Sequence, residues 1–198
     1  MSAEGALADR IDAVAIGASA GGVEALCRLL PALPASTRAA VFVVLHLPRD
    51  RPSLLASIFQ ARCALPVLEA QDKEPVAPGT VYVAPPDYHL LVDEGPRIAL
   101  STDVPVNFSR PAIDVLFESA ADLYRERLLA VVLTGANHDG AAGLAAVQQR
   151  GGVAVVQEPE SAQVALMPAA ALLRNPTSLV MSIGEICVLL ATLGEKAA

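Results

Sequence analysis

The chain has 198 residues and a formal net charge of −7, with 54% hydrophobic and 18% charged residues. This is the composition of a globular protein, and the length suits one domain with a buried core. The negative charge, without a dense block of Lys or Arg, excludes a general nucleic-acid binder. The longest apolar runs are too short to cross a bilayer, and the first ten residues lack the apolar core of a signal peptide. We predict a cytoplasmic protein without membrane insertion.

Short β-branched apolar runs alternate with helical patterns along the chain, which indicates βαβ units and a parallel sheet. We expect strands at residues 14–16, 41–45, 81–84, 129–133, 153–156 and 179–183. Helices are expected at 23–30, 52–61, 111–127, 140–150 and from about 184 onward. Residues 90–92 and 97–100 read as the two strands of a hairpin. The predicted fold class is α/β, a doubly wound, mostly parallel sheet with helices on both faces and an antiparallel β-hairpin.

A glycine-rich segment follows the first predicted strand. Residues 17–22 read Gly-Ala-Ser-Ala-Gly-Gly, which puts Ser19 on a turn at the carboxyl end of that strand. A serine held there between small residues can be exposed as a nucleophile, as in a nucleophile elbow. The same glycines could instead hold a phosphate at a helix N-terminus. This turn alone leaves both interpretations open.

A histidine and an aspartate occupy corresponding places after two other predicted strands. His46 ends the strand at 41–45, and Asp139 lies in the loop after the strand at 129–133. Since the carboxyl ends of parallel strands meet at one edge of a sheet, we expect Ser19, His46 and Asp139 to gather there. These are the residue types of a nucleophile, a general base and an orienting carboxylate.

Each member of such a triad has a physical task. His46 would take the proton of Ser19 as the hydroxyl attacks a carbonyl, and Asp139 would fix the imidazole tautomer. The oxyanion that forms needs fixed donors, for which backbone amides at Ala20 or Ala136 are candidates.

Six segments of the chain occur in the order found in CheB-type chemotaxis methylesterases. They are residues 15–26 (AIGASAGGVEAL), 45–48 (LHLP), 81–89 (VYVAPPDYH), 110–117 (RPAIDVLF), 133–143 (LTGANHDGAAG) and 167–168 (MP). The likeness extends over nearly the whole chain, and six ordered motifs are much more specific than any one of them. The chain therefore resembles the catalytic domain of that family.

The resemblance implies a function and a set of site residues. The family's catalytic residues would fall on Ser19, His46 and Asp139, and its pattern suggests that Met167 lines the site. The implied reaction is hydrolysis of glutamate γ-methyl esters on the cytoplasmic helices of methyl-accepting chemotaxis receptors, with deamidation of receptor glutamines as a related activity. A serine triad needs neither metal nor other cofactor for this reaction.

The chain also departs from the family pattern. We expect residues 1–12 to be a short tail, residues 13–193 the methylesterase domain and residues 194–198 a second tail, with no receiver domain ahead of the esterase. Control by a separate regulator or adaptor protein is then expected. The loop before Asp139 has Ala136-Asn137 where the family often has Met-Gly.

Parts of the sequence also fit three other interpretations. A dinucleotide site disagrees with the glycine spacing, and it would want an acidic residue where the chain has His46. A metal site could use His46, His89 and His138, but these lack the close spacing of a convincing zinc site. The third is a catalytically weak or inactive interaction module with the same fold, in a chemosensory pathway.

Overall fold

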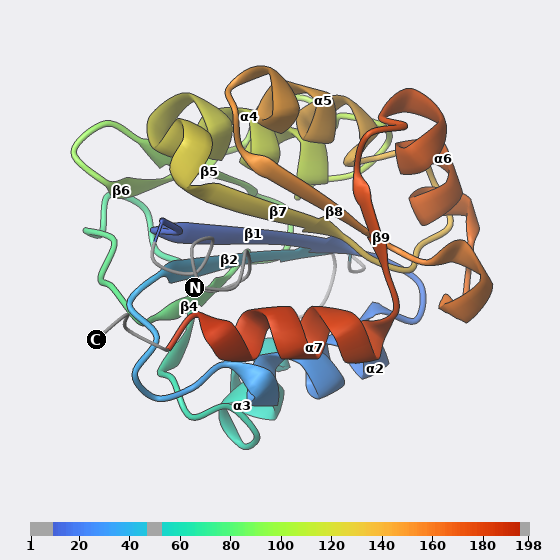
Figure 1. Cartoon of the computed structure of the whole chain (residues 1–198). Helices are drawn as coiled ribbons and strands as arrows, with labels where there is room; N and C mark the ends of the chain where they lie inside the picture. The colour runs from blue at the N-terminus through green and yellow to red at the C-terminus, as the bar shows by residue number, and fades with distance from the viewer. Residues whose placement is uncertain (1–9, 47–52, 195–198) are drawn as a thin grey trace.

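The computed structural model of the chain describes residues 10–46 and 53–194. Its centre is a sheet of seven parallel strands in the order β3-β4-β2-β1-β7-β8-β9. The strands are β1 (Ala13–Ala18), β2 (Ala40–Leu45), β3 (Val67–Glu69), β4 (Val81–Val83), β7 (Leu128–Val132), β8 (Val153–Gln157) and β9 (Leu179–Met181). Figure 1 shows this sheet between two layers of helices. The predicted α/β class is confirmed.

The central strands are buried on both faces. Every residue of β1, β2 and β7 is buried, which agrees with their continuous apolar runs. Successive residues of one strand point to opposite faces, so Val14 and Ile16 join one core whereas Ala13 and Ala15 join the other. The small alanines on the second face leave room for close packing of a helix.

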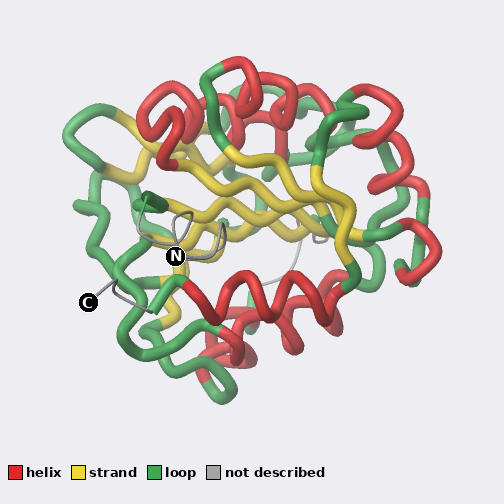
Figure 2. The backbone as a smooth tube through the Cα atoms, in the orientation of Figure 1, coloured by secondary structure: helices red, strands yellow, loops and turns green. Residues whose placement is uncertain are grey.

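Helices cover both faces of the sheet, as Figures 1 and 2 show. One face carries α2 (Gly22–Leu29), α3 (Leu55–Gln60) and α7 (Ile183–Thr192), and the other carries α4 (Ile113–Tyr124), α5 (Ala141–Gln149) and α6 (Leu166–Arg174). Short 3₁₀ turns occupy Leu30–Ala32, Arg125–Arg127 and Pro159–Ser161. Among the described residues, no helix is long and apolar enough to cross a membrane.

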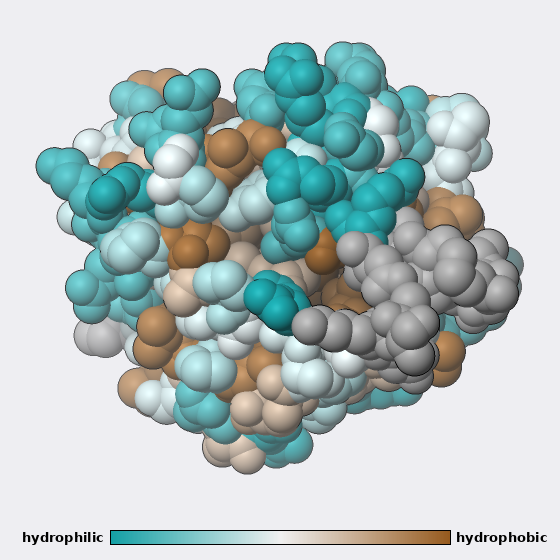
Figure 3. Space-filling view, turned by 60° about the vertical axis from the view of Figure 1, so that its left-hand side comes forward, coloured by the Kyte–Doolittle hydropathy of each residue, from teal (hydrophilic) through white to brown (hydrophobic). Residues whose placement is uncertain are grey.

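The predicted hairpin is present as β5 (His89–Asp93) and β6 (Arg97–Ser101). The two strands are antiparallel and form a separate two-stranded sheet, which packs beside α4. Figure 3 shows one face of the molecule, on which hydrophilic side chains predominate in the upper part and apolar ones lie in separate patches.

Two elements escaped sequence prediction. Strand β3 has three residues, of which only Val67 is buried, so it carries no alternating apolar pattern. Helix α6 contains Pro168, which in sequence argues against a helix but is tolerated in a first turn. The predicted helix at 52–61 begins at Leu55 in the structure, and residue 52 lies outside the described residues.

The topology brings three loops together at one edge of the sheet. Strand β1 is the centre of the order β2-β1-β7, and the chain winds to opposite sides of it. Ala18 is in register with Leu45, which places Ser19 beside His46 at the carboxyl ends of β1 and β2. Such a switch point is where open α/β sheets form their sites.

Candidate active site

Ser19 lies on the turn between β1 and α2. The Ser19 carbonyl accepts a hydrogen bond of 2.8 Å from the Gly22 amide, and the Ser19 amide donates one of 3.0 Å to the Thr134 carbonyl. Gly21 has φ 79° and ψ −3°, the left-handed conformation that the third residue of a type II turn requires. Ser19 itself is not among the described non-glycine residues with positive φ. The strain of a nucleophile elbow is therefore absent from this serine, and the glycine adopts the unusual conformation instead.

The loop after β7 is fastened to this turn. The Thr134 hydroxyl donates to the carbonyl of Ala20 at 2.8 Å, and the Thr134 amide donates to the Gln157 side chain at 2.9 Å. Both Thr134 and Gln157 are buried. Buried bonds of this kind fix the position of the Ser19 turn relative to the loop that carries Asp139.

The side chains of His46 and Asp139 are hydrogen-bonded to each other. Nε2 of His46 lies 2.8 Å from Oδ2 of Asp139, and their side chains are 12% and 0% exposed. The His46 amide donates to the Ala18 carbonyl at 3.1 Å, which holds the end of β2 against β1. A buried carboxylate that accepts from one ring nitrogen fixes the tautomer of the imidazole.

The Asp139 carboxylate sits against the N-terminus of α4. Oδ2 accepts a hydrogen bond of 2.6 Å from the Ile113 amide, and Oδ1 accepts one of 3.0 Å from the Asp114 amide. Burial raises the pKa of Asp139, but the hydrogen bonds from His46 and from these two amides outweigh it. The pKa of Asp139 therefore lies below its ordinary value of 3.8, and the free N–H groups of a helix N-terminus favour the negative form.

A second buried carboxylate, Asp114, adjoins the first. Nδ2 of Asn107 donates to Asp114 Oδ2 at 2.8 Å and to Asp139 Oδ1 at 3.1 Å. The Gly143 amide donates to Asp114 Oδ1 at 2.6 Å. Burial raises the pKa of Asp114 against the lowering effect of the Gly143 amide, and the charge of Asp139 raises it further. Asn107 thus bridges two buried carboxylates whose pKa values are shifted in opposite directions.

Asn137 occupies the other side of the His46 ring. Its Nδ2 lies 3.3 Å from His46 Nδ1 and 3.4 Å from Ser109 Oγ. Its Oδ1 accepts a hydrogen bond of 3.1 Å from the Asp139 amide. Both ring nitrogens of His46 therefore face polar groups, a carboxylate on one side and an amide on the other.

Ser19 and His46 line one open cavity of about 420 Å³, together with Leu45, Val23 and Gln163. Ser19 is half-buried, and its hydroxyl makes no hydrogen bond with His46 or with any other described residue. The structure thus places the serine and the histidine in the same cavity without the bond that would join them. Catalytic hydrogen bonds are often long in an apo enzyme and tighten only with substrate.

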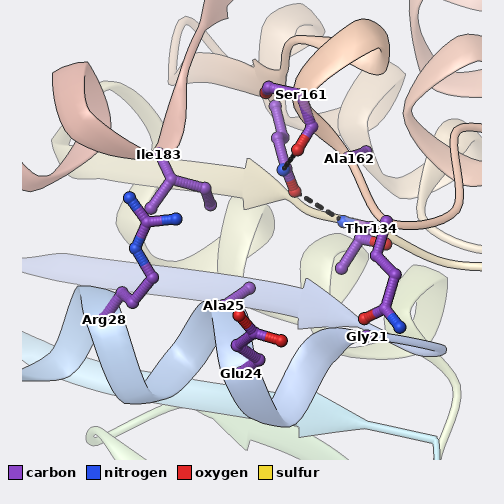
Figure 4. Close-up of a pocket in the computed structure, with 10 residues that line it drawn as sticks. Gly21, Glu24, Ala25, Arg28, Thr134, Ser161, Ala162 and Ile183 are labelled. Atoms are coloured by element: carbon purple, nitrogen blue, oxygen red, sulfur yellow. Dashed lines mark hydrogen bonds between the residues drawn. The ribbon is translucent and has the colours of Figure 1, made fainter.

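A second cavity of about 270 Å³ adjoins the first, and the two share Gly21, Glu24 and Gln163. In Figure 4 the side chains of Glu24 and Arg28 rise from α2 toward this cavity, opposite Ser161. The hollow beside Ser19 is therefore continued by a second one with polar and charged walls.

Comparison with known proteins places this geometry in a family. Residues 14–190 match the model of the CheB methylesterase family. The chain belongs to this family. A relative from Leptospira interrogans is 41% identical over 185 residues, which are 93% of this chain and 96% of the relative. The crystal structure of the Thermotoga maritima CheB methylesterase catalytic domain has a TM-score of 0.87 and 33% identity, over 92% of this chain and 98% of that one.

Other members of the CheB family are longer than the matching region. The protein-glutamate methylesterase/protein-glutamine glutaminase of Symbiobacterium thermophilum is 43% identical over 155 residues, which are 78% of this chain and 43% of that protein. The region that this chain shares with it is thus less than half of that relative.

The three further candidates of this CheB-family site lie in different environments. Ala20 and Ala136 are exposed, and within the described part of the chain their amides donate to no protein acceptor. Met167 is wholly buried, and its side chain packs where a Cβ on Gly135 would lie. Its amide donates to the Gly135 carbonyl at 2.9 Å. Met167 therefore packs against the loop that leads to Asp139, and its role at the site stays a prediction.

The three histidines of the alternative metal site, His46, His89 and His138, do not form a shared site among the described residues. Nδ1 of His89 accepts from the Ala112 amide at 3.2 Å, and Nε2 lies 3.2 Å from the Val104 carbonyl, so backbone groups use both of its nitrogens. His138 is exposed in its loop. Among residues 10–46 and 53–194, no group of His, Cys, Asp or Glu has a metal-binding arrangement.

Sequence reasoning overlooked Asn107 and the position of Asp114. Asn107 lies 32 residues before Asp139 in a turn without periodicity, so nothing in the sequence links the two. Asp114 belongs to the helix predicted at 111–127, but nothing in the helical pattern indicates that this charged residue is only 5% exposed. The one sequence signal for this burial was Gly143. A Cβ at that position would lie 3.0 Å from backbone atoms of Asp114, so the glycine allows close packing there.

Proposed function

We propose that this chain hydrolyses glutamate γ-methyl esters on the cytoplasmic helices of chemoreceptors, with Ser19 as nucleophile, His46 as general base and Asp139 as orienting carboxylate. The observation that carries the proposal is the placement of Ser19 and His46 in one cavity, with His46 Nε2 2.8 Å from the buried Asp139. The family membership and the names of relatives such as the Symbiobacterium enzyme support it. A cytoplasmic location follows from such a substrate.

In the proposed mechanism each proton transfer involves particular atoms. Since Asp139 accepts from Nε2, the basic nitrogen is Nδ1. As Oγ of Ser19 bonds to the ester carbon, its proton passes to Nδ1 and the carbonyl electron pair moves to the oxygen. Collapse of the tetrahedral intermediate breaks the bond to the methoxy oxygen, which takes the proton from Nδ1 and leaves as methanol.

The second half of the reaction returns the enzyme to its starting state. Water attacks the glutamyl ester of Ser19 and gives its proton to Nδ1, and the Ser19 oxygen recovers that proton as it leaves. The product is a glutamate carboxylate. A glutamine side chain would follow the same steps with ammonia as the leaving group.

Developing negative charge on the carbonyl oxygen needs donors that are already in place. The amides of Ala20 and Ala136 lie on the two loops that the buried Thr134 fastens together. Both loops belong to the edge of the sheet from which Ser19 emerges. These amides are our candidates for the backbone part of the oxyanion hole.

The test is methanol release from a methylated receptor fragment. Ser19→Ala should lower kcat by roughly 10⁴–10⁶-fold, as loss of a nucleophile does in serine hydrolases, while the fold and binding of the fragment persist. The matched control is Ser161→Ala, a serine of the adjoining cavity. Full activity of Ser19→Ala would rule out the proposed mechanism. A wild-type chain that binds the fragment but releases no methanol would instead favour the interaction module.

A further inference from the structure

The side-chain amide of Asn137 faces the nitrogen that acts as base. Its Nδ2 lies 3.3 Å from His46 Nδ1, and its Oδ1 accepts from the Asp139 amide at 3.1 Å. A backbone N–H can only donate, so the oxygen of Asn137 must be the end that faces it. This bond settles the orientation of the amide, which would otherwise be an assignment. The NH₂ group therefore points to His46.

The tautomer of the neutral His46 ring follows from its other partner. An ionised Asp139 only accepts hydrogen bonds, so Nε2 carries the hydrogen, and Nδ1 of the neutral ring is an acceptor. Asn137 donates to that acceptor. The lone pair that has to take the Ser19 proton is therefore already bound to an amide N–H before substrate arrives.

Proton transfer reverses this contact. Once Nδ1 holds the Ser19 proton, two N–H groups face each other and the hydrogen bond between Asn137 and His46 is lost. At the same moment the carbonyl oxygen of the ester, whose carbon is now bonded to Ser19 Oγ, becomes an anion in need of donors. Asn137 is kept close by its bond to the Asp139 amide.

We propose that Asn137 is a catalytic residue of this chain, the side-chain donor of its oxyanion hole, and that proton transfer to His46 redirects its N–H from Nδ1 to the oxyanion. The inference rests on the proposed function, because it needs Ser19 and His46 in their roles. It concerns this chain in particular, since a glycine, which the family often has at this place, offers no side-chain donor. Asn137 then adds a side-chain N–H donor to the candidate backbone donors of the oxyanion hole, the amides of Ala20 and Ala136.

Two substitutions separate the donor from the acceptor of this side chain. Asn137→Ala removes both and should lower kcat for methyl ester hydrolysis by roughly 10- to 10³-fold, the usual range for one oxyanion donor, with KM changed by less than about threefold. Asn137→Asp keeps an oxygen for the Asp139 amide but has no N–H, so it should lose at least as much. A merely structural role for Asn137 would let the aspartate restore activity, and that result would overturn the proposal.

A transition-state analogue gives a second readout that loop packing would not move. An aliphatic boronic acid bonds to the serine Oγ as a tetrahedral anion, so its affinity should fall in Asn137→Ala by the same factor as kcat/KM. His138→Ala, an exposed neighbour in the same loop, should leave both quantities within about twofold.

The experiments distinguish an error in the role of Asn137 from an error in the proposed function. If Ser19→Ala is inactive but Asn137→Ala keeps kcat within about twofold of the wild-type value, only the role of Asn137 is wrong. A drop in kcat without a drop in boronate affinity also contradicts it. If Ser19→Ala remains active, the proposed function fails whatever Asn137 does.

Discussion

Nε2 of His46 lies 2.8 Å from Oδ2 of Asp139, so Nδ1, which faces the side-chain amide of Asn137, is the ring nitrogen that Asp139 does not engage. The carboxylate is fully buried and rests on the first amides of α4. The histidine is thus oriented by a group that is itself fixed by a helix end. The tautomer is set by the fold and needs no substrate to select it.

Asp139→Asn should nearly abolish turnover while the chain still folds. In the wild type, His46 Nε2 and the Ile113 amide donate to a carboxylate oxygen of Asp139. In the variant an NH₂ group would face these two donors. We expect kcat/KM to fall by roughly 10²- to 10⁴-fold, as it does when the orienting carboxylate of a triad becomes an amide. Methanol release from a methylated receptor fragment measures this. Wild-type kinetics in the variant would remove Asp139 from the mechanism.

The lowered pKa of Asp139 also predicts how stability depends on pH. Its folded pKa lies below the ordinary 3.8, so ionised Asp139 stabilises the fold above about pH 4, and this contribution is lost as the pH falls through the lowered pKa. The difference in free energy of unfolding between wild type and Asp139→Asn should therefore be largest from pH 5 to 7 and shrink toward pH 3. Urea unfolding at several pH values tests this, and a difference independent of pH would contradict it.

Asn107→Ala should weaken both stability and catalysis. The substitution leaves two buried carboxylates without their shared donor, which costs roughly 1–3 kcal/mol of unfolding free energy. Asn107→Asp should cost more, because it adds a third carboxyl group to the pair. Val104→Ala, an exposed residue of the same loop, is the control and should stay within about 0.5 kcal/mol of wild type. Equal unfolding midpoints for all three variants would show that the bridge contributes nothing.

The sequence predicts the sheet well because its strands are buried on both faces. A short, β-branched apolar run such as Val41–Leu45 is typical of a strand buried on both faces, and its alternation with helical segments indicates a parallel sheet. The same argument places Ser19 and His46 at adjacent strand ends. It cannot foresee β3 or α6, because a three-residue edge strand and a helix with Pro168 lack periodicity.

The network around the site is less predictable than the fold. Asn107 reaches Asp139 through a turn in which Asn107 and Phe108 both have positive φ, and no local pattern announces such a conformation in non-glycine residues. A motif places Met167 near the site, and the packing of its side chain against Gly135 could not be read from that motif. Motifs thus indicate which segments meet, whereas packing decides which side chains face the cavity.

Chelators should leave esterase activity unchanged. Backbone groups occupy both nitrogens of His89, and His46 is held by Asp139 and Asn137, so these histidines have no nitrogen left for a shared metal. Incubation with EDTA followed by an assay of methanol release is the measurement. Activity that is lost with chelator and restored by zinc would contradict the triad.

Gly21→Ala tests whether the turn that holds Ser19 needs a glycine. A Cβ at Gly21 would lie 2.5 Å from Gln163 Oε1 and 2.8 Å from its Cβ, in a backbone with φ 79°. Gly95 offers a matched control, because its φ is 77° but a Cβ there would meet nothing within 4 Å. Backbone strain alone should cost each variant on the order of 1 kcal/mol.

Only Gly21→Ala should also disturb the site. The new Cβ would displace either Gln163, which lines the cavity of Ser19, or the turn that holds Ser19 itself. We therefore expect Gly95→Ala to keep its kcat within about twofold of wild type, and Gly21→Ala to lose at least roughly tenfold, since small displacements of reacting groups are costly in rate. Urea unfolding gives the stability of both variants and methanol release gives their kcat. Equal kcat values in the two variants would mean that the turn tolerates displacement and that the glycine serves stability alone.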